Sequence, residues 1–103
     1  MTKKYVYKLI RDYRNHLENN GISVSQMILF GSQAKGTARN GSDIDLCVVS
    51  PNFGHDRHNE RVMLMNYGLS VSTLIEPHPY SPNELTDKYD PLADEIRETG
   101  IVV

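Results

Sequence analysis

Two short apolar segments lie close together in the sequence, and each is bounded by residues that favour turns. The first covers residues 25–30 and ends at a glycine-serine pair, and the second covers residues 43–49 and ends before Pro51. An asparagine-glycine turn signal lies between them. Apolar runs of this length, flanked by glycine and proline, are typical of buried β-strands. The sequence therefore predicts two neighbouring core strands joined by a polar, glycine-containing loop.

Helices and strands alternate over the rest of the chain. Apolar residues recur at helical spacing over residues 3–19, which predicts an amphipathic helix. The other predicted elements are a short helical turn over residues 32–36, helices over residues 56–67 and from Ser81-Pro82 and Asp90-Pro91, and strands over residues 70–76 and 101–103. Pro77 and Pro79 are expected to end the strand over residues 70–76. This order indicates an α/β (α+β) fold with a small mixed sheet.

The bulk properties exclude several classes of protein. A length of 103 residues predicts one domain, residues 1–103. The net charge of −2 argues against a dedicated nucleic-acid binder, which usually carries a basic surface. No apolar stretch is long enough to span a membrane, and the N-terminus lacks the apolar core of a signal peptide. The single cysteine, Cys47, excludes an internal disulfide, and we expect a cytoplasmic protein.

The loop after the first strand has two interpretations as a phosphate-binding loop. The first is the P-loop pattern G-x-x-x-x-G-K-[ST], in which the lysine follows the second glycine and reaches the β and γ phosphates. Here Lys35 precedes Gly36, and Thr37 occupies the place of the lysine. The domain is also small for the parallel sheet that a P-loop requires. The P-loop interpretation is therefore disfavoured.

The second interpretation depends on Asp43 and Asp45, which are separated by one residue at the start of the second strand. Strand side chains alternate in direction, so both carboxylates leave the same face, about 7 Å apart along the backbone. Two close carboxylates repel each other unless cations lie between them. Mg²⁺ binds through one or two carboxylates plus substrate phosphates, and a two-metal site can clamp the attacking and leaving oxygens at phosphorus.

The glycine-serine corner fits the phosphate end of such a substrate. Gly31 allows a sharp turn and a close approach of the backbone to a ligand, and Ser32 offers a hydroxyl and free backbone N–H groups. Lys35 and Arg39 add positive charge in the same loop. We predict that the nucleotide is bound by Gly31, Ser32, Lys35, Arg39 and Ser42, and that the metal is bound by Asp43 and Asp45.

The segment FGSQAKGTARNGSDIDLCVVS resembles the signature of the nucleotidyltransferases related to DNA polymerase beta. The chain length is similar to that of the minimal nucleotidyltransferase (MNT) domains. The resemblance implies a mixed sheet with helices on one side and an open active face. It also implies Mg²⁺-dependent transfer of a nucleoside monophosphate from ATP or another nucleoside triphosphate to an acceptor. Gln33 stands where family members commonly have arginine.

The family has a third carboxylate, on the next core strand, that acts as general base toward the acceptor hydroxyl. By alternation Ser72, Leu74 and Glu76 would share one face of that strand, and Glu76 is the acid among them. The resemblance places an aspartate near the position of Ser72 in related domains. Two alternatives remain open at this point: Glu76 supplies the third catalytic carboxylate, or the site lacks its base and is weakened or inactive.

The resemblance also suggests a partner. MNT domains resemble the antitoxin half of toxin–antitoxin modules and pair with a helical HEPN-type protein. The first hypothesis is therefore an enzyme that transfers AMP to a hydroxyl on that partner. The second is a module that neutralises the partner by contact alone. Homo-oligomerisation is left open. His55, Arg57, His58 and Arg61 are interpreted as a solvated helix start, and His78 as a rigid exit from the strand.

Overall fold

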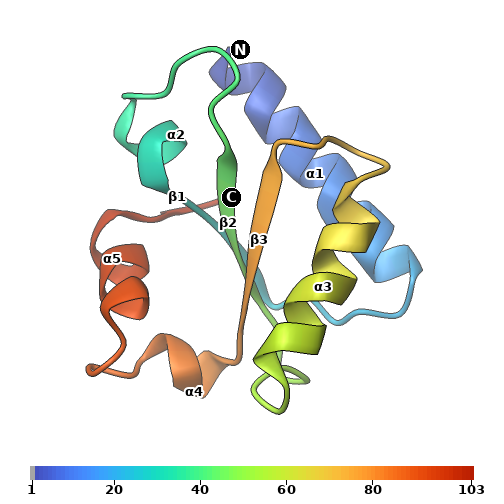
Figure 1. The fold of residues 1–103 in the computed structure, drawn as a ribbon, viewed down its shortest axis with the longest axis vertical. Coiled ribbons are helices and arrows are strands. Elements are labelled where there is room, and N and C mark those ends of the chain that lie inside the picture. Colours follow the sequence, from blue (N-terminus) through green and yellow to red (C-terminus); the bar gives the residue numbers. More distant parts are fainter. Residues whose placement is uncertain (1) are drawn as a thin grey trace.

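A computed structural model describes residues 2–103 and shows a four-stranded mixed sheet with helices on both faces (Figure 1). The elements follow one another as α1 (Lys3–Asn19), β1 (Gln26–Phe30), α2 (Gly31–Lys35), β2 (Ile44–Val49), α3 (Arg57–Gly68), β3 (Ile75–Tyr80), α4 (Pro82–Leu85), α5 (Pro91–Thr99) and β4 (Ile101–Val102). The predicted fold class is confirmed.

The strand order in the sheet is β3-β2-β1-β4. β1 pairs antiparallel with β2 and with β4, whereas β2 and β3 are parallel. The register places Phe30 of β1 opposite Asp45 of β2, and Asp45 opposite Glu76 of β3. The end of β1, the start of β2 and the start of β3 therefore meet at one edge of the sheet, where the polar residues of the sequence motif are found.

Alternation along the strands divides the apolar residues between two cores. Ile44, Leu46 and Val48 of β2 point toward α1 and α3, where they are fully buried. Cys47 and Val49 point to the opposite face and pack in a second cluster with residues of α5. The two longest helices, α1 and α3, lie on one face of the sheet. The expectation of helices on one side needs correction, because α5 packs against part of the other face (Figure 1).

The helix starts follow from local capping. Ser81 and Glu84 form the predicted capping box at α4, with proline at the first turn. Asp90 caps α5 by accepting hydrogen bonds from the backbone N–H groups of Leu92 and Ala93. These caps fix where the chain re-enters helix after β3, and they place α5 against the face that carries Asp45.

The third core strand corrects the prediction from sequence. It covers Ile75–Tyr80 rather than residues 70–76, so Ser72 and Leu74 precede it and do not share a strand face with Glu76. Pro77 and Pro79 lie inside the strand instead of ending it. β3 is an edge strand, and an edge strand can carry proline because one row of its N–H groups needs no partner in the sheet.

The remaining bounds agree with the predictions to within a few residues. The predicted helix over residues 3–19 is confirmed as α1, and the predicted strand at residues 101–103 as β4. Asp43 lies just before β2, which begins at Ile44. Within residues 2–103, no helix is long and apolar enough to cross a membrane.

Candidate active site

The Gly31 corner lies directly against Asp45. Gly31 follows β1 with a φ of 71°, a conformation that side chains disfavour. A Cβ atom placed on Gly31 would lie 2.3 Å from Oδ2 of Asp45, well inside van der Waals contact. Glycine is therefore required at this position for two reasons, its backbone conformation and the close approach of the carboxylate. The corner and the strand carboxylate, 14 positions apart in sequence, form one site.

Glu76 flanks Asp45 on the other side, through the parallel pairing of β2 with β3. Burial raises the pKa of Glu76, and hydrogen bonding with Asp43 and the negative charges of Asp45 and Asp43 raise it further. Burial also raises the pKa of Asp45, and the negative charge of Asp43 raises it further. A hydrogen bond with Glu76 and the positive charge of Arg61 act in the opposite direction and lower it. The structure thus brings together the three predicted carboxylates of Asp43, Asp45 and Glu76.

Mutual repulsion in this cluster fits the chemistry of a cation site, because a bound cation would offset the charges that raise the pKa values of Asp45 and Glu76. Within residues 2–103, no group of three or more His, Cys, Asp or Glu side chains is arranged to hold a metal ion. Mg²⁺ typically takes one or two carboxylates and fills its octahedral shell with waters and substrate phosphate oxygens. Asp43 and Asp45 are suited to that partial role.

The other predicted nucleotide-binding residues are dispersed around the corner. Ser32 lies in the first turn of α2. Lys35 Nζ contacts Glu95 Oε1 of α5 at 3.2 Å, in an exposed ion pair. Ser42 Oγ accepts a hydrogen bond from the backbone N–H of Arg39, so these two residues close the loop that leads to Asp43. The structure therefore places Gly31 at the Asp45 carboxylate and Ser32 next to it in the first turn of α2, with Lys35 against α5 and Arg39 and Ser42 in the loop.

His78 and Arg61 are site residues that the sequence interpretation missed. His78 shares its strand face with Glu76, and its Nε2 lies 3.8 Å from Oδ1 of Asp45. Burial, helped by the charges of Arg61 and Arg57, lowers the pKa of His78 to about 4, so its ring is neutral at pH 7. The interpretation of His78 as a rigid exit from the strand is wrong, because β3 continues through both prolines to Tyr80.

Arg61 of α3 reaches across the edge strand to the carboxylates. Its Nη2 lies 3.3 Å from Oε1 of Glu76, and its Nε is buried without a hydrogen-bond partner. Its positive charge lowers the pKa of both Glu76 and Asp45, against the larger effect of burial. The interpretation of Arg61 as part of a solvated helix start is therefore wrong. A pattern of α3 residues pointing toward β3 could have revealed it only if β3 had been assigned correctly.

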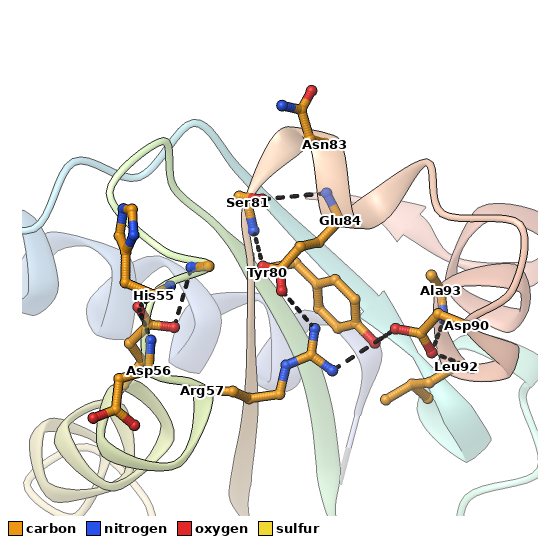
Figure 2. Close-up of polar contacts among 12 residues, drawn as sticks. His55, Asp56, Arg57, Tyr80, Ser81, Asn83, Glu84, Asp90, Leu92 and Ala93 are labelled. Atoms are coloured by element: carbon orange, nitrogen blue, oxygen red, sulfur yellow. Dashed lines mark hydrogen bonds and ion pairs between the residues drawn. The ribbon is translucent and has the colours of Figure 1, made fainter.

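A cavity of about 510 Å³ lies beside β3 and is lined by Arg57, His58, Arg61, His78, Pro79, Tyr80 and Leu92. Two of these residues, Arg61 and His78, contact the carboxylates of Glu76 and Asp45. Figure 2 shows how its wall is held. The guanidinium of Arg57 lies 4.5 Å from the centre of the Tyr80 ring and contacts Glu84 at 3.0 Å. The Tyr80 hydroxyl donates a 2.8 Å hydrogen bond to Asp90, the cap of α5. This network ties α3, β3, α4 and α5 together beside the cavity.

The mixed sheet, the Gly31 corner and the row of strand carboxylates together define a protein of the nucleotidyltransferase class. A family model described as a nucleotidyltransferase domain matches residues 9–100. The chain belongs to this family, and the predicted resemblance is confirmed.

Individual relatives agree with this assignment. A Methanocaldococcus jannaschii protein named a "Putative protein adenylyltransferase" is 36% identical over 70 residues, which cover 59% of this chain and 48% of the relative. The chain thus matches about half the length of that protein.

Two solved structures share the fold. A Sulfolobus solfataricus protein described as a "putative nucleotidyltransferase" superimposes with a TM-score of 0.72 at 15% identity, covering 97% of this chain and 80% of that one. A toxin–antitoxin structure with AMP-PNP gives a TM-score of 0.58 at 19% identity, covering 99% and 72% of the two chains.

Proposed function

We propose that the protein transfers a nucleoside monophosphate, AMP from ATP, to a hydroxyl group on a partner protein in a Mg²⁺-dependent reaction. The observation that carries this proposal is the row formed by Gly31, Asp45 and Glu76 across three adjacent elements. In this row the Gly31 corner would bind the phosphate chain, the Asp45 carboxylate would bind the metal, and the Glu76 carboxylate would act as the base.

The transfer is an in-line displacement at the α-phosphorus. The acceptor hydroxyl oxygen forms a bond to that phosphorus, and the bond from the phosphorus to the bridging oxygen of pyrophosphate breaks. The hydroxyl proton passes to Glu76, and pyrophosphate leaves with the bond electrons. The raised pKa of Glu76 suits a general base, because a stronger base accepts a proton more readily. Mg²⁺ bound by Asp43 and Asp45 would stabilise the charge on the phosphate oxygens.

The loop residues hold the phosphate chain in this proposal. Gly31 and Ser32 offer backbone N–H groups at the corner. Lys35 can turn from Glu95 toward a phosphate at little cost, because exposed ion pairs contribute at most about 1 kcal/mol. Arg39 and Ser42 cover the phosphates from the loop that precedes Asp43. The substrate is thereby held with its pyrophosphate on the β1 side of Asp45.

The comparisons support the finer parts of the proposal. The name of the M. jannaschii relative supports AMP as the transferred group and a protein as the acceptor. The toxin–antitoxin structure supports a toxin–antitoxin setting, and we propose a helical HEPN-type protein as the partner. The single buried Cys47 fits a reducing compartment, and we place the protein in the cytoplasm.

Label transfer tests the proposal. The protein is incubated with Mg²⁺ and ATP labelled on its α-phosphate, together with the protein encoded by the neighbouring gene. The enzyme hypothesis predicts covalent label on the second protein, lost on chelation of Mg²⁺ and lost in Asp45→Asn. Tight binding of the second protein without transfer, unaffected by Asp45→Asn, would instead identify a module that neutralises its partner by contact.

A further inference from the structure

Helix α3 carries apolar residues on two faces. Its inner face buries Leu64 against α1 and the sheet. Its outer face exposes Val62, Met65 and Leu69, with exposed fractions of 43%, 45% and 63%, and Leu69 is the residue that caps the end of the helix. These three residues, which we call the α3 stripe, recur at helical spacing and form a continuous row on the surface. An exposed row of large apolar side chains is typical of a protein contact surface.

The α3 stripe leads into the cavity beside the carboxylates. His58 lies one helical turn before Val62 on the same row, and it lines the cavity together with Arg61. Arg61 in turn contacts Glu76. The row from His58 to Leu69 therefore runs along about 16 Å of helix, at 1.5 Å per residue, and its His58 end opens onto the cavity. His58 thus connects the α3 stripe to the cavity.

In-line geometry fixes which side of the site the acceptor must approach. The corner at Gly31 lies on the β1 side of Asp45, and Glu76 lies on the β3 side. Attacking and leaving oxygens lie on opposite sides of the phosphorus in a displacement of this kind. With the pyrophosphate at the corner, the acceptor hydroxyl must arrive from the β3 side, where the cavity lies.

We propose that the acceptor is a side chain of a partner protein that docks along α3, with apolar side chains on the α3 stripe and its hydroxyl-bearing side chain in the cavity. This inference rests on the proposed function and adds the docking surface and the chemistry of the partner. A nucleic acid fits less well, because the stripe is apolar, the net charge is −2, and the cavity cations Arg57 and Arg61 are paired with carboxylates.

A double variant of the stripe tests the docking surface. V62E and L69E together place two charges on the stripe without touching the buried face of α3. Val102→Glu is the matched control, because Val102 is 63% exposed and lies on β4, at the opposite edge of the sheet from β3. The acceptor is first identified by incubating cell extract with wild-type protein, Mg²⁺ and α-labelled ATP. The extract protein that becomes labelled is then prepared without label and used as the probe. Label transfer to this probe and Mg²⁺-dependent ATP binding are then measured for all three proteins.

The outcomes separate this inference from the proposed function. We expect the stripe variant to label the probe with an apparent affinity lower by at least about tenfold, the equivalent of 1.4 kcal/mol, with ATP affinity unchanged and the control at the wild-type level. Equal labelling by the stripe variant would overturn the docking surface and leave the proposed function standing. If the wild type binds ATP but labels no protein in the extract, the proposal of a protein acceptor is overturned. If the wild type shows no Mg²⁺-dependent ATP binding, the proposed function itself is overturned.

Self-association provides a further outcome. Sedimentation of the wild type and of the stripe variant shows whether the α3 stripe pairs two copies of this chain. A wild-type dimer that the stripe variant abolishes would assign the surface to a second copy and would contradict docking of a different protein. A wild type that stays monomeric, or a dimer that survives in the stripe variant, leaves the stripe available to the partner and agrees with the proposal.

Discussion

Asp45 of β2 and Glu76 of β3 stand opposite each other in the register of two parallel strands. This pairing places the third acidic group beside the aspartates that we propose to bind metal, although Asp45 and Glu76 are distant in sequence. It favours the first of the two alternatives left open by the sequence, in which Glu76 supplies the base. The pairing depends on a strand that passes through two prolines.

Gly31→Ala is expected to impair nucleotide binding. The new methyl group would lie 2.3 Å from Asp45 Oδ2 and would displace that carboxylate. The positive φ adds strain of about 1–2 kcal/mol. Gly36→Ala is the matched control, because Gly36 has a φ of 75° and a methyl group there would meet no other part of residues 2–103 within 4 Å. Gly31→Ala should lose at least as much stability as Gly36→Ala in thermal unfolding, because it adds the contact with Asp45 to the backbone strain, and only Gly31→Ala should lose Mg²⁺-dependent ATP affinity. Equal ATP affinity in the two variants would contradict the prediction that the close approach of Gly31 to Asp45 is needed for nucleotide binding.

Glu76→Gln is expected to slow transfer while leaving ATP binding in place. The amide keeps the shape of the side chain but cannot accept the hydroxyl proton, and removal of a general base lowers rates by about 10²–10⁴. Glu98→Gln, on the exposed side of α5, is the control. Single-turnover label transfer gives the rate, and calorimetry gives the ATP affinity. A Glu76→Gln rate equal to that of the control would exclude Glu76 as the base.

Asp45→Asn is expected to stabilise the metal-free protein. Burial and neighbouring negative charges raise the pKa of Asp45, so its ionised form at pH 7 is less favourable in the folded state than in the unfolded state. Removal of that charge should therefore raise the melting temperature in the absence of Mg²⁺. The advantage should shrink as the pH falls and the wild-type carboxylate becomes protonated. A lower melting temperature for Asp45→Asn at pH 7 would contradict this assignment of the charges.

Tyr80→Phe is expected to destabilise the fold by about 1 kcal/mol, because the Tyr80 hydroxyl is buried and donates to Asp90. Burial raises the pKa of Asp90, but hydrogen bonds from Tyr80, Ala93 and Leu92 and the charge of Arg57 hold it below its usual value of 3.8 overall. A depressed folded-state pKa gives stability above the usual pKa, and this stability is lost as the pH falls through the folded-state pKa. The cost of Tyr80→Phe should therefore be largest near neutral pH and smaller under strongly acidic conditions.

Thermal unfolding across this pH range measures both parts of that prediction. Tyr89→Phe is the control, because the Tyr89 side chain is 82% exposed and should tolerate the loss of its hydroxyl. A destabilisation by Tyr80→Phe that stays constant between neutral and strongly acidic pH would show that the ionised form of Asp90 does not drive the effect.

Local signals in the sequence were sufficient for most of the fold. The period of apolar residues in α1 and the capping box at Ser81 depend on neighbouring residues alone, and both were predicted correctly. The Asp43–Asp45 pair was recognised for the same reason. β3 was misplaced because proline usually ends a strand, and its tolerance here depends on the position of β3 at the sheet edge. That position is a property of the whole fold.

Two site residues, His78 and Arg61, were missed for the same reason. His78 and Arg61 reach the carboxylates only because β3 runs parallel to β2 and α3 lies beside β3. The contact of Arg57 with Tyr80 and Glu84 likewise joins segments distant in sequence (Figure 2). No local pattern encodes these distances, so they could be predicted only after the strand register was known.

Calorimetry of ATP binding, with and without Mg²⁺, tests most directly whether the corner and the carboxylates form one metal-bridged triphosphate site. The proteins compared are the wild type, Asp43→Asn, Asp45→Asn and, as control, Asp12→Asn on the exposed face of α1. We predict that Mg²⁺ strengthens ATP binding in the wild type and in the control, and that both site variants lose most of this gain. Unchanged Mg²⁺-dependent affinity in Asp43→Asn and Asp45→Asn would contradict the account.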